Sequence, residues 1–367
     1  MHNARRLGTI IGLAAAGLLT PAASFAQPAA VKPAEEVFKN ITELKGTPAD
    51  QLNPAMQFIS ASLGVNCDFC HVQGKPEADD KNTKRTARQM MQMTALINKT
   101  SFGGRQQITC NSCHNGAQRP VASPPVQDSD APMRAAAMTP PAAGAGATPQ
   151  PTVDDILAKY TAAVGGADAM KKVTSRVMKG SIAAGGTNTP IEVFTKAPNL
   201  RVTVSHSANG DSFTAFDGKA GWMGNTGRPA RDMSPAESGA SSLDAEFYLP
   251  LRLKEIYPQL RRGRAETIGG VECDVLNGTA PGKPAVRLYF AKNSGLLVRQ
   301  VRFADTPMGR LPTQIDYADY KEMDGVKTPM RWTLSRPNGR FTIQIADAKN
   351  NAPVDDAKFA KPSGEVK

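Results

Sequence analysis

The 367-residue sequence has few histidines, few aromatic residues and little that resembles a common catalytic motif. It contains 4 histidines and 5 cysteines, and only 6% of its residues are aromatic. Beyond the N-terminus, no segment reaches the roughly 18 apolar residues needed to span a bilayer, so no transmembrane helix is predicted there. No Ser/His/Asp set, phosphate-binding loop or paired-carboxylate motif is evident, which leaves the cysteines and histidines as the main chemical signal.

The N-terminus has the features of a cleavable export signal. Arg5 and Arg6 precede an apolar run, and the small residues Ser24 and Ala26 stand just before Gln27. This pattern predicts a signal peptide over residues 1–26. No cysteine follows the apolar run to carry a lipid anchor. We therefore expect a periplasmic protein that is soluble or peripherally associated with the membrane.

Most of the cysteines and two histidines belong to one pattern that occurs twice. The stretch VNCDFCH contains Cys67, Cys70 and His71, and ITCNSCH repeats the spacing with its own set, Cys110, Cys113 and His114. In an exported protein the four cysteines could form two disulfides, and two Cys-x-x-Cys pairs could also bind zinc. Neither alternative requires a histidine after each pair.

The Cys-x-x-Cys-His pattern is the attachment signature of c-type haem. Two thiols on one helical turn can form thioethers with the two vinyl groups of a porphyrin, and the next residue presents its imidazole to the iron. The sequence thus predicts two covalently bound haem c groups. The thioethers and first iron ligands are those four cysteines with His71 and His114.

Methionine is the natural candidate for the sixth ligand of each iron, because His206 is the only other histidine after residue 26. A thioether is a soft iron ligand that raises the haem potential. Met56 lies on a predicted helix that Gly64 ends just before Cys67. A second predicted helix, over residues 82–102, has an apolar stripe with Met90 and Met93, and we place Lys84 on its opposite, charged side.

The two methionine helices and the two haem motifs together resemble the cytochrome c subunit family of photosynthetic reaction centres. The similar segments are MQFISASLGVNCDFCH, ARQMMQMTALIN and ITCNSCHNG, all within residues 35–120. The resemblance implies that Met56 and Met90 are the axial methionines, with the adjacent Met91 as second choice. This chain differs from the four-haem family pattern, because only two haem units are present and no histidine lies between Asn98 and Cys110.

The resemblance implies electron transfer between redox proteins of the envelope or a membrane electron-transfer complex, as in photosynthesis. It implies a carrier rather than an enzyme. Two alternatives remain open: a dihaem oxidoreductase or peroxidase, and an envelope protein that binds a lipid or quinone and carries a cytochrome module. The formal net charge of +11 comes from dispersed residues. It suits acidic redox partners or anionic lipid, and nucleic acid is not an expected partner.

The composition divides the chain into several parts. Residues 27–121 form the predicted dihaem domain, which is mainly helical. Residues 122–152 are rich in proline, alanine and glycine, which is typical of an extended linker. Residues 153–367 begin with a helix predicted to start at an Asp cap and to end at Gly165 and Gly166, followed by alternating apolar and polar residues. The fold class is therefore multidomain, an α cytochrome with a β domain.

The β domain is expected to be a large antiparallel sheet of about ten short strands. Asn-Gly or Asp-Gly pairs at Asn209, Asp217, Asn277, Asp324 and Asn338 are strong hairpin signals. One helical insertion is predicted at FYLPLRLKEIYPQL. A sheet of this size must curl to bury its apolar face, and the pattern is similar to the envelope lipoprotein-carrier family, whose half-barrel holds acyl chains. The resemblance implies a lipid or small apolar ligand in this domain.

Overall fold

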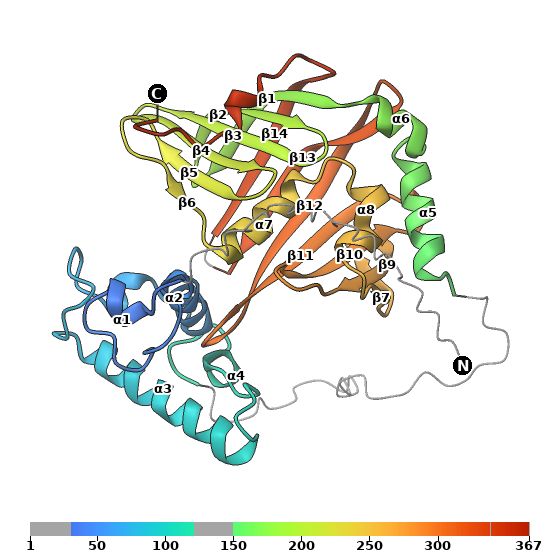
Figure 1. The fold of residues 1–367 in the computed structure, drawn as a ribbon. Coiled ribbons are helices and arrows are strands. Elements are labelled where there is room, and N and C mark those ends of the chain that lie inside the picture. Colours follow the sequence, from blue (N-terminus) through green and yellow to red (C-terminus); the bar gives the residue numbers. More distant parts are fainter. Residues whose placement is uncertain (1–30, 121–149, 338, 367) are drawn as a thin grey trace, which may run out of the picture. The chain divides into compact units, whose positions relative to one another are not determined.

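The computed structural model describes residues 31–120, 150–337 and 339–366. The predicted signal peptide (1–26) and most of the predicted linker (122–152) lie outside the described residues. Residues 31–120, here called the N-terminal region, form helices and turns with a few isolated bridges, and residues 150–366, the β region, form one large sheet with helices (Figure 1).

The N-terminal region has two long helices that lead to the two cysteine motifs. The long helices are α2 (Ala49–Leu63) and α3 (Asn82–Ser101). The shorter elements are α1 (Ala34–Val37), a 3₁₀ turn η1 (Cys67–Phe69) and α4 (Cys110–His114). The motifs therefore begin short helical turns, as thioether attachment to one porphyrin edge requires.

Helix α2 forms where apolar side chains recur at helical spacing, as predicted. Leu52, Ala55 and Ile59 are buried, and Met56 and Leu63 are partly buried against the same cluster. The helix ends at Gly64, whose φ of 64° is the left-handed conformation that glycine adopts at little cost.

Helix α3 corrects one prediction. The sequence placed Lys84 on the exposed, charged side of this helix, but Lys84 and Asn98 are its two buried residues. Met90 and Met93 of the predicted apolar stripe are instead 37% and 44% exposed. Periodicity failed here because Lys84 and Asn98 are buried through hydrogen bonds to backbone groups of neighbouring loops, which compensate for the loss of solvent.

The end of α2 packs directly on the turn that follows α4. The Gly116 amide donates a hydrogen bond to the Ser62 carbonyl at 2.8 Å. A Cβ atom at Gly64 would lie 2.2 Å from the Gly116 carbonyl oxygen, so the two backbones can approach only because Gly64 has no side chain. Since Gly64 precedes Cys67 and Gly116 follows His114, this contact holds the two motifs beside each other.

We expect Gly64→Ala to destabilise the protein much more than Gly103→Ala, a matched control. Both positions have positive φ (64° and 60°), but a Cβ at Gly103 would meet nothing within 4 Å. The control should cost about 1 kcal/mol of unfolding free energy for the left-handed conformation. Gly64→Ala should cost roughly 1–3 kcal/mol more, because a backbone must move. Denaturant unfolding measures both, and equal losses would show that the contact is not needed.

The β region contains a 14-stranded antiparallel sheet, more strands than the ten predicted. Part of the difference comes from strands of two or three residues, which are too short to show an alternation of apolar and polar side chains. The strands are β1 (Ser175–Ala184), β2 (Thr187–Lys196), β3 (Leu200–Ser207), β4 (Gly210–Asp217), β5 (Gly221–Asn225), β6 (Arg231–Asp232), β7 (Arg261–Arg262), β8 (Glu266–Ile268), β9 (Val271–Gly278), β10 (Ala285–Ala291), β11 (Leu297–Thr306), β12 (Gly309–Met323), β13 (Val326–Arg336) and β14 (Gly339–Asn350).

The sheet is a meander in which the first and last strands pair at the centre. Its order is β6-β5-β4-β3-β2-β1-β14-β13-β12-β11-β10-β9-β7, and β8 also pairs with β9. Since β6 and β7 stand at opposite ends of this order, the sheet is open, as a half-barrel requires. The large antiparallel β domain is thus confirmed.

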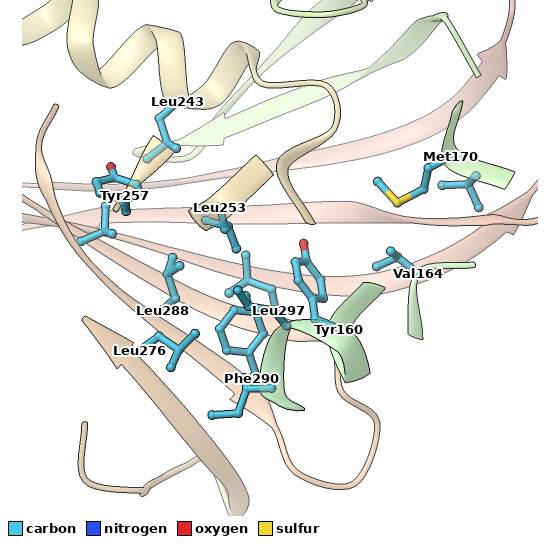
Figure 2. Close-up of a cluster of buried hydrophobic side chains, with 14 of the residues drawn as sticks. Tyr160, Val164, Met170, Leu243, Leu253, Tyr257, Leu276, Leu288, Phe290 and Leu297 are labelled. Atoms are coloured by element: carbon cyan, nitrogen blue, oxygen red, sulfur yellow. The ribbon is translucent and has the colours of Figure 1, made fainter. Parts of the chain in front are cut away.

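Helices pack against part of the sheet and form the main core. They are α5 (Val153–Ala163), α6 (Gly166–Lys172), α7 (Pro235–Ala245) and α8 (Leu249–Ile256), with a 3₁₀ turn η2 (Asp356–Lys358) near the end. Figure 2 shows Tyr160 from α5, Val164 just after it, Leu253 from α8, and Leu288 and Phe290 from β10 in one buried cluster. The predicted insertion is α8, whereas α7 was not predicted.

The first of these helices starts at a threonine rather than at the predicted aspartate. Thr152 caps α5 by accepting a hydrogen bond from the Asp155 amide, at 3.2 Å, and the Asp155 carboxylate accepts one from the Thr152 amide, at 2.8 Å. This reciprocal capping satisfies amides at the start of the helix. The predicted end at Gly165 and Gly166 is correct, and the helix direction changes there into α6.

Candidate functional site

The first cysteine motif forms a single tight turn after α2. The His71 amide donates to the Cys67 carbonyl at 2.9 Å, which places the three motif side chains on one turn. Cys67 is exposed and Cys70 is partly buried. Burial raises the pKa of the Cys70 thiol, against a smaller opposite effect of its hydrogen bond with Thr83. The turn thus presents one accessible and one sheltered thiol.

The second motif forms α4 and repeats that arrangement. The Thr109 amide, just before the helix, donates to the Ser112 hydroxyl at 3.1 Å. Asn115 ends the helix with a φ of 45°. Burial raises the pKa of the partly buried Cys110, whereas Cys113 is exposed. Each motif therefore has one exposed thiol, although the order of the two is reversed between them.

Both motif histidines are held by the same kind of hydrogen bond. Nδ1 of His71 lies 2.8 Å from the Pro76 carbonyl oxygen, and Nδ1 of His114 lies 3.0 Å from the Ala117 carbonyl oxygen. A carbonyl oxygen can only accept, so in each ring Nδ1 carries the proton. Nε2 of each neutral ring then keeps its lone pair, which is the state that a metal-ligating histidine needs.

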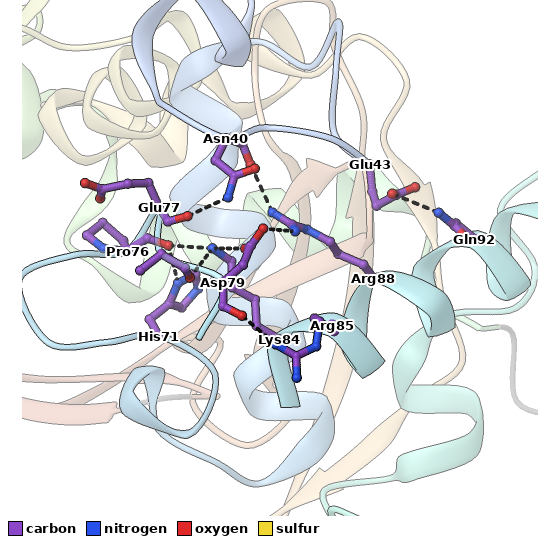
Figure 3. Close-up of polar contacts among 11 residues, drawn as sticks. Asn40, Glu43, His71, Pro76, Glu77, Asp79, Lys84, Arg85, Arg88 and Gln92 are labelled. Atoms are coloured by element: carbon purple, nitrogen blue, oxygen red, sulfur yellow. Dashed lines mark hydrogen bonds and ion pairs between the residues drawn. The ribbon is translucent and has the colours of Figure 1, made fainter. Parts of the chain in front are cut away.

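A buried lysine supports the loop that orients His71 (Figure 3). The Lys84 ammonium donates to the Pro76 carbonyl at 2.9 Å and to the Ala78 carbonyl at 2.8 Å. It also pairs with the Asp79 carboxylate at 3.0 Å. Pro76 thus accepts hydrogen bonds from both Lys84 and His71, so the lysine positions the imidazole through one shared oxygen.

Asp79 closes this network from the outer side. Arg88 contacts its carboxylate at 2.8 Å. Hydrogen bonds from Arg88, then Asn40 and Lys84, hold the pKa of Asp79 well below its usual range. The carboxylate therefore stays charged well into the acidic pH range.

Asn98 supports the segment that leads into the second motif. Its side-chain oxygen accepts from the Gln107 and Ile108 amides at 3.0 and 2.9 Å, and its amide donates to the Ile108 carbonyl at 2.7 Å. These bonds hold the segment that enters Cys110. The sequence prediction did not identify Lys84 or Asn98, because neither matches a motif and a lysine on a helix is usually exposed.

The candidate axial methionines differ in their surroundings. Met56 and Met91 are partly buried against the apolar cluster around α2, which Cys110 also contacts. Met90, Met93 and Leu96 point away from that cluster, and Leu96 is 60% exposed. A row of exposed apolar side chains beside a cysteine-histidine motif is the surface that a bound porphyrin would cover.

The donor set fits haem better than it fits the two alternatives. No disulfide joins the five cysteines, which all lie in described residues. Within the ranges that the structure describes, no three His, Cys, Asp or Glu side chains are grouped to hold a metal ion. Each motif combines a thiol pair with an oriented imidazole, which are the donors that covalently bound haem requires.

The remaining histidine and cysteine of the described residues lie in the β region. His206, near the end of β3 as predicted, has Nδ1 3.0 Å from an Asp211 carboxylate oxygen across the hairpin. Cys273 is fully buried in a strand, also as predicted. Both have ordinary structural surroundings, so neither belongs to the cysteine-histidine site.

We expect Lys84→Met to lower the unfolding free energy by about 2–4 kcal/mol, because two hydrogen bonds to loop carbonyls and the ion pair with Asp79 are lost. Lys99→Met is the matched control, since Lys99 is exposed in the same helix. It should change stability by less than about 0.5 kcal/mol. Denaturant unfolding compares the two, and similar effects would mean that Lys84 does not support the loop.

A curated relative matches less than a quarter of the chain. The chain is 29% identical over 87 residues to the photosynthetic reaction center cytochrome c subunit of Thermochromatium tepidum. The match includes 23% of this chain and spans 22% of the length of that protein.

Solved structures with low sequence identity were also found. A DUF1329 family protein from Desulfovibrio piger is 16% identical with a TM-score of 0.42, and the match covers 57% of this chain and 98% of that one. A LolA superfamily protein from Nitrosomonas europaea is 14% identical with a TM-score of 0.41, covering 58% and 99%.

The family profile for the photosynthetic reaction centre cytochrome C subunit matches residues 8–279, which is most of the chain. The match extends well beyond the two cysteine motifs, into the β region. It agrees with the resemblance seen in the motifs themselves. The chain therefore belongs to the photosynthetic reaction centre cytochrome C subunit family.

Proposed function

We propose that this protein is an exported electron carrier with two covalently bound haem c groups. The family implies covalently bound haem c. The observation that carries the proposal is the matching state of His71 and His114, each with Nδ1 bonded to a backbone carbonyl and Nε2 available as a ligand. Two histidines oriented in this way, each after a thiol pair, favour two groups rather than one.

The residues of each motif have separate roles in this proposal. Cys67 and Cys70 would form the thioethers of the first haem, and His71 would bind its iron. The corresponding residues of the second haem are Cys110, Cys113 and His114. Haem c supplies one-electron redox chemistry when it is bound. The chain contributes the covalent attachment, the imidazole orientation and the apolar surroundings.

The contact between Gly64 and Gly116 supports transfer between the two groups. It holds the start of the first motif against the end of the second through backbone atoms. Close and constant spacing of two redox groups is what a carrier needs to pass one electron internally. The loops oriented by Lys84 and Asn98 keep each motif in place on either side of this contact.

We propose the envelope as the location, with redox proteins or a membrane electron-transfer complex as partners. None of the helices in the described ranges is long and apolar enough to cross a membrane. The net charge of +11 favours docking to acidic proteins or anionic lipid surfaces. A reaction centre is one such complex.

Mass spectrometry tests the number and position of the haems. The exported protein, matured with a haem-attachment system, should carry two haem additions after loss of residues 1–26. Limited proteolysis within residues 123–152 should release a coloured fragment of residues 27–121 with both additions, because we propose that this fragment and residues 153–367 are separate domains. One addition, bound zinc, or haem on the larger fragment would contradict the proposal.

Axial ligation distinguishes a carrier from a peroxidase, which needs an open iron position. We propose Met56 and Met90 as the sixth ligands. The oxidised protein should show the near-infrared sulfur-to-iron band, and Met56→Ala and Met90→Ala should each remove about half of it and lower one of two redox steps. Each haem should be six-coordinate and low-spin.

Met91→Ala and Met93→Ala are the matched controls on the same helix, and they should leave both redox steps nearly unchanged. If Met91→Ala removed part of the band instead, the sixth ligand would be Met91, which packs against the apolar cluster around α2. A high-spin haem in the wild-type protein that binds cyanide or peroxide rapidly would favour the dihaem oxidoreductase or peroxidase and would overturn the carrier proposal.

A second function is favoured by a cavity in the β region. The cavity has a volume of about 170 Å³ and is lined mostly by apolar and aromatic side chains, with Met178, Leu297 and Trp332 among them. We propose that the β region binds a small apolar ligand or part of a lipid there. Calorimetric titration with octanol tests this, and the absence of binding would contradict it.

A further inference from the structure

The cavity of the β region has two arginines in its wall. Arg176 is on β1 and Arg201 is on β3, and Thr195 of β2 pairs with both of them in the sheet register. Residues paired directly across antiparallel strands have their side chains on the same face. The two arginines therefore lie on one face, two strands apart, which is about 9.5 Å between their Cα atoms.

The carboxylates that line the same cavity are already paired. Asp244 contacts Arg302 at 2.7 Å, and Glu246 contacts Arg252 at 2.8 Å. Arg252 also contacts Glu255 at 2.6 Å, a residue that does not line the cavity. The two carboxylates of the cavity wall thus make their short ion pairs with Arg302 and Arg252 rather than with Arg176 or Arg201.

In the part of the chain that the structure describes, neither Arg176 nor Arg201 has a carboxylate within 4.0 Å. Arg176 Nε donates to the Asn350 side-chain oxygen at 2.7 Å, and its guanidinium lies over the Phe247 ring, 5.5 Å from the centroid. Arg201 makes a longer bond of 3.4 Å to the Asp244 carbonyl. A guanidinium has five donors, so both retain donors for a further partner.

Both arginines are partly buried. Burial lowers the pKa of Arg176 to about 10 and also lowers the pKa of Arg201, against smaller opposite effects of the Asp324 and Asp244 charges. A partly buried guanidinium without a directly paired anion is unfavourable, and an anionic ligand would reduce that cost. The exposed Lys327 adds a third positive charge to the cavity lining.

Neutral donors and apolar groups complete the wall. Tyr160 and Tyr317 line the cavity, and burial raises the pKa of both phenols, so they stay protonated. The volume of about 170 Å³ is close to that of an engineered cavity that holds benzene, about 150 Å³. The wall thus offers a small apolar space beside two positive groups.

We propose that this cavity binds a carboxylate with an apolar chain, such as a fatty acid, with its head group held by Arg176 and Arg201. A carboxylate matches the planar fork of a guanidinium. The inference rests on the proposal that the β region binds an apolar ligand, and it adds the anionic head group as the feature that is recognised. It does not depend on haem.

Isothermal titration calorimetry of the full-length mature protein with octanoate tests the inference. We expect octanoate to bind at least tenfold more tightly than octanol, which has the same chain without the charge. Arg201→Gln and Arg176→Gln should each weaken octanoate binding by tenfold or more, since a hydrogen bond to a charged group contributes about 1.5–3 kcal/mol. Arg340→Gln, at an exposed position on β14, is the matched control and should bind octanoate as the wild type does.

The outcomes separate the two proposals. Octanol binding as tight as octanoate binding would overturn the anionic head group and leave the apolar ligand supported. Binding of neither would overturn both. An equal loss in Arg340→Gln would show that general charge rather than the cavity is responsible. Circular dichroism of each variant checks the fold, and the two cavity variants test the same prediction independently.

Discussion

The close approach of two backbones at Gly64 and Gly116 is the constraint on which the N-terminal region depends. A side chain at Gly64 would overlap the Gly116 carbonyl, and a hydrogen bond from Gly116 to Ser62 adds to the contact. Helix α2 therefore ends directly on the turn after α4. Because one cysteine motif follows Gly64 and the other precedes Gly116, the spacing of both motifs is set by backbone atoms, which are less mobile than side chains.

At the first motif the carbonyl oxygen that orients the histidine is held from outside the motif, and at the second motif the segment that enters it is held. Lys84 binds the same Pro76 carbonyl that orients His71, and Asn98 ties the segment before Cys110. These two residues are the buried positions of α3, so a single helix supports both motifs. Met90 and Met93 of α3 are exposed and do not belong to the apolar cluster around α2. Exposed apolar side chains at this place suit the proposed porphyrin.

In the β region, two arginines lie on one face of the sheet without a paired carboxylate. Its sheet brings arginines from separate strands to one face, and the nearby carboxylates are already paired with other arginines. Partly buried charges without a paired carboxylate are unfavourable, yet the cavity that these arginines line can hold a ligand that supplies the missing charge. The excess of positive charge in the whole sequence is therefore partly concentrated at one place inside this region.

The sequence by itself determined the features that rest on local spacing. The Cys-x-x-Cys-His pattern, the end of α2 at Gly64 and the alternation of the longer strands all follow from contacts between residues that are near in the chain. The family assignment from the motifs is likewise confirmed. The sequence also placed the turns at Asn209, Asp217 and Asp324, since Asn-Gly and Asp-Gly adopt the required backbone conformations with little strain. The turn predicted at Asn277 is wrong, because Asn277 pairs with Arg287 inside β9, and Asn338 lies outside the described residues.

Only the tertiary structure decided which polar residues are buried. Lys84 was predicted to be exposed because a charged side chain in a helix usually faces solvent, and its burial depends on loop carbonyls that periodicity cannot place. Strands of two residues were not predicted because they are too short to show a period. Helix α7 was not predicted because, of its buried residues, only Leu243 has a large apolar side chain. The pairing of Arg176 and Arg201 through Thr195 depends on the register of three strands. Register arises from long-range packing, and so no local pattern in the sequence contains it.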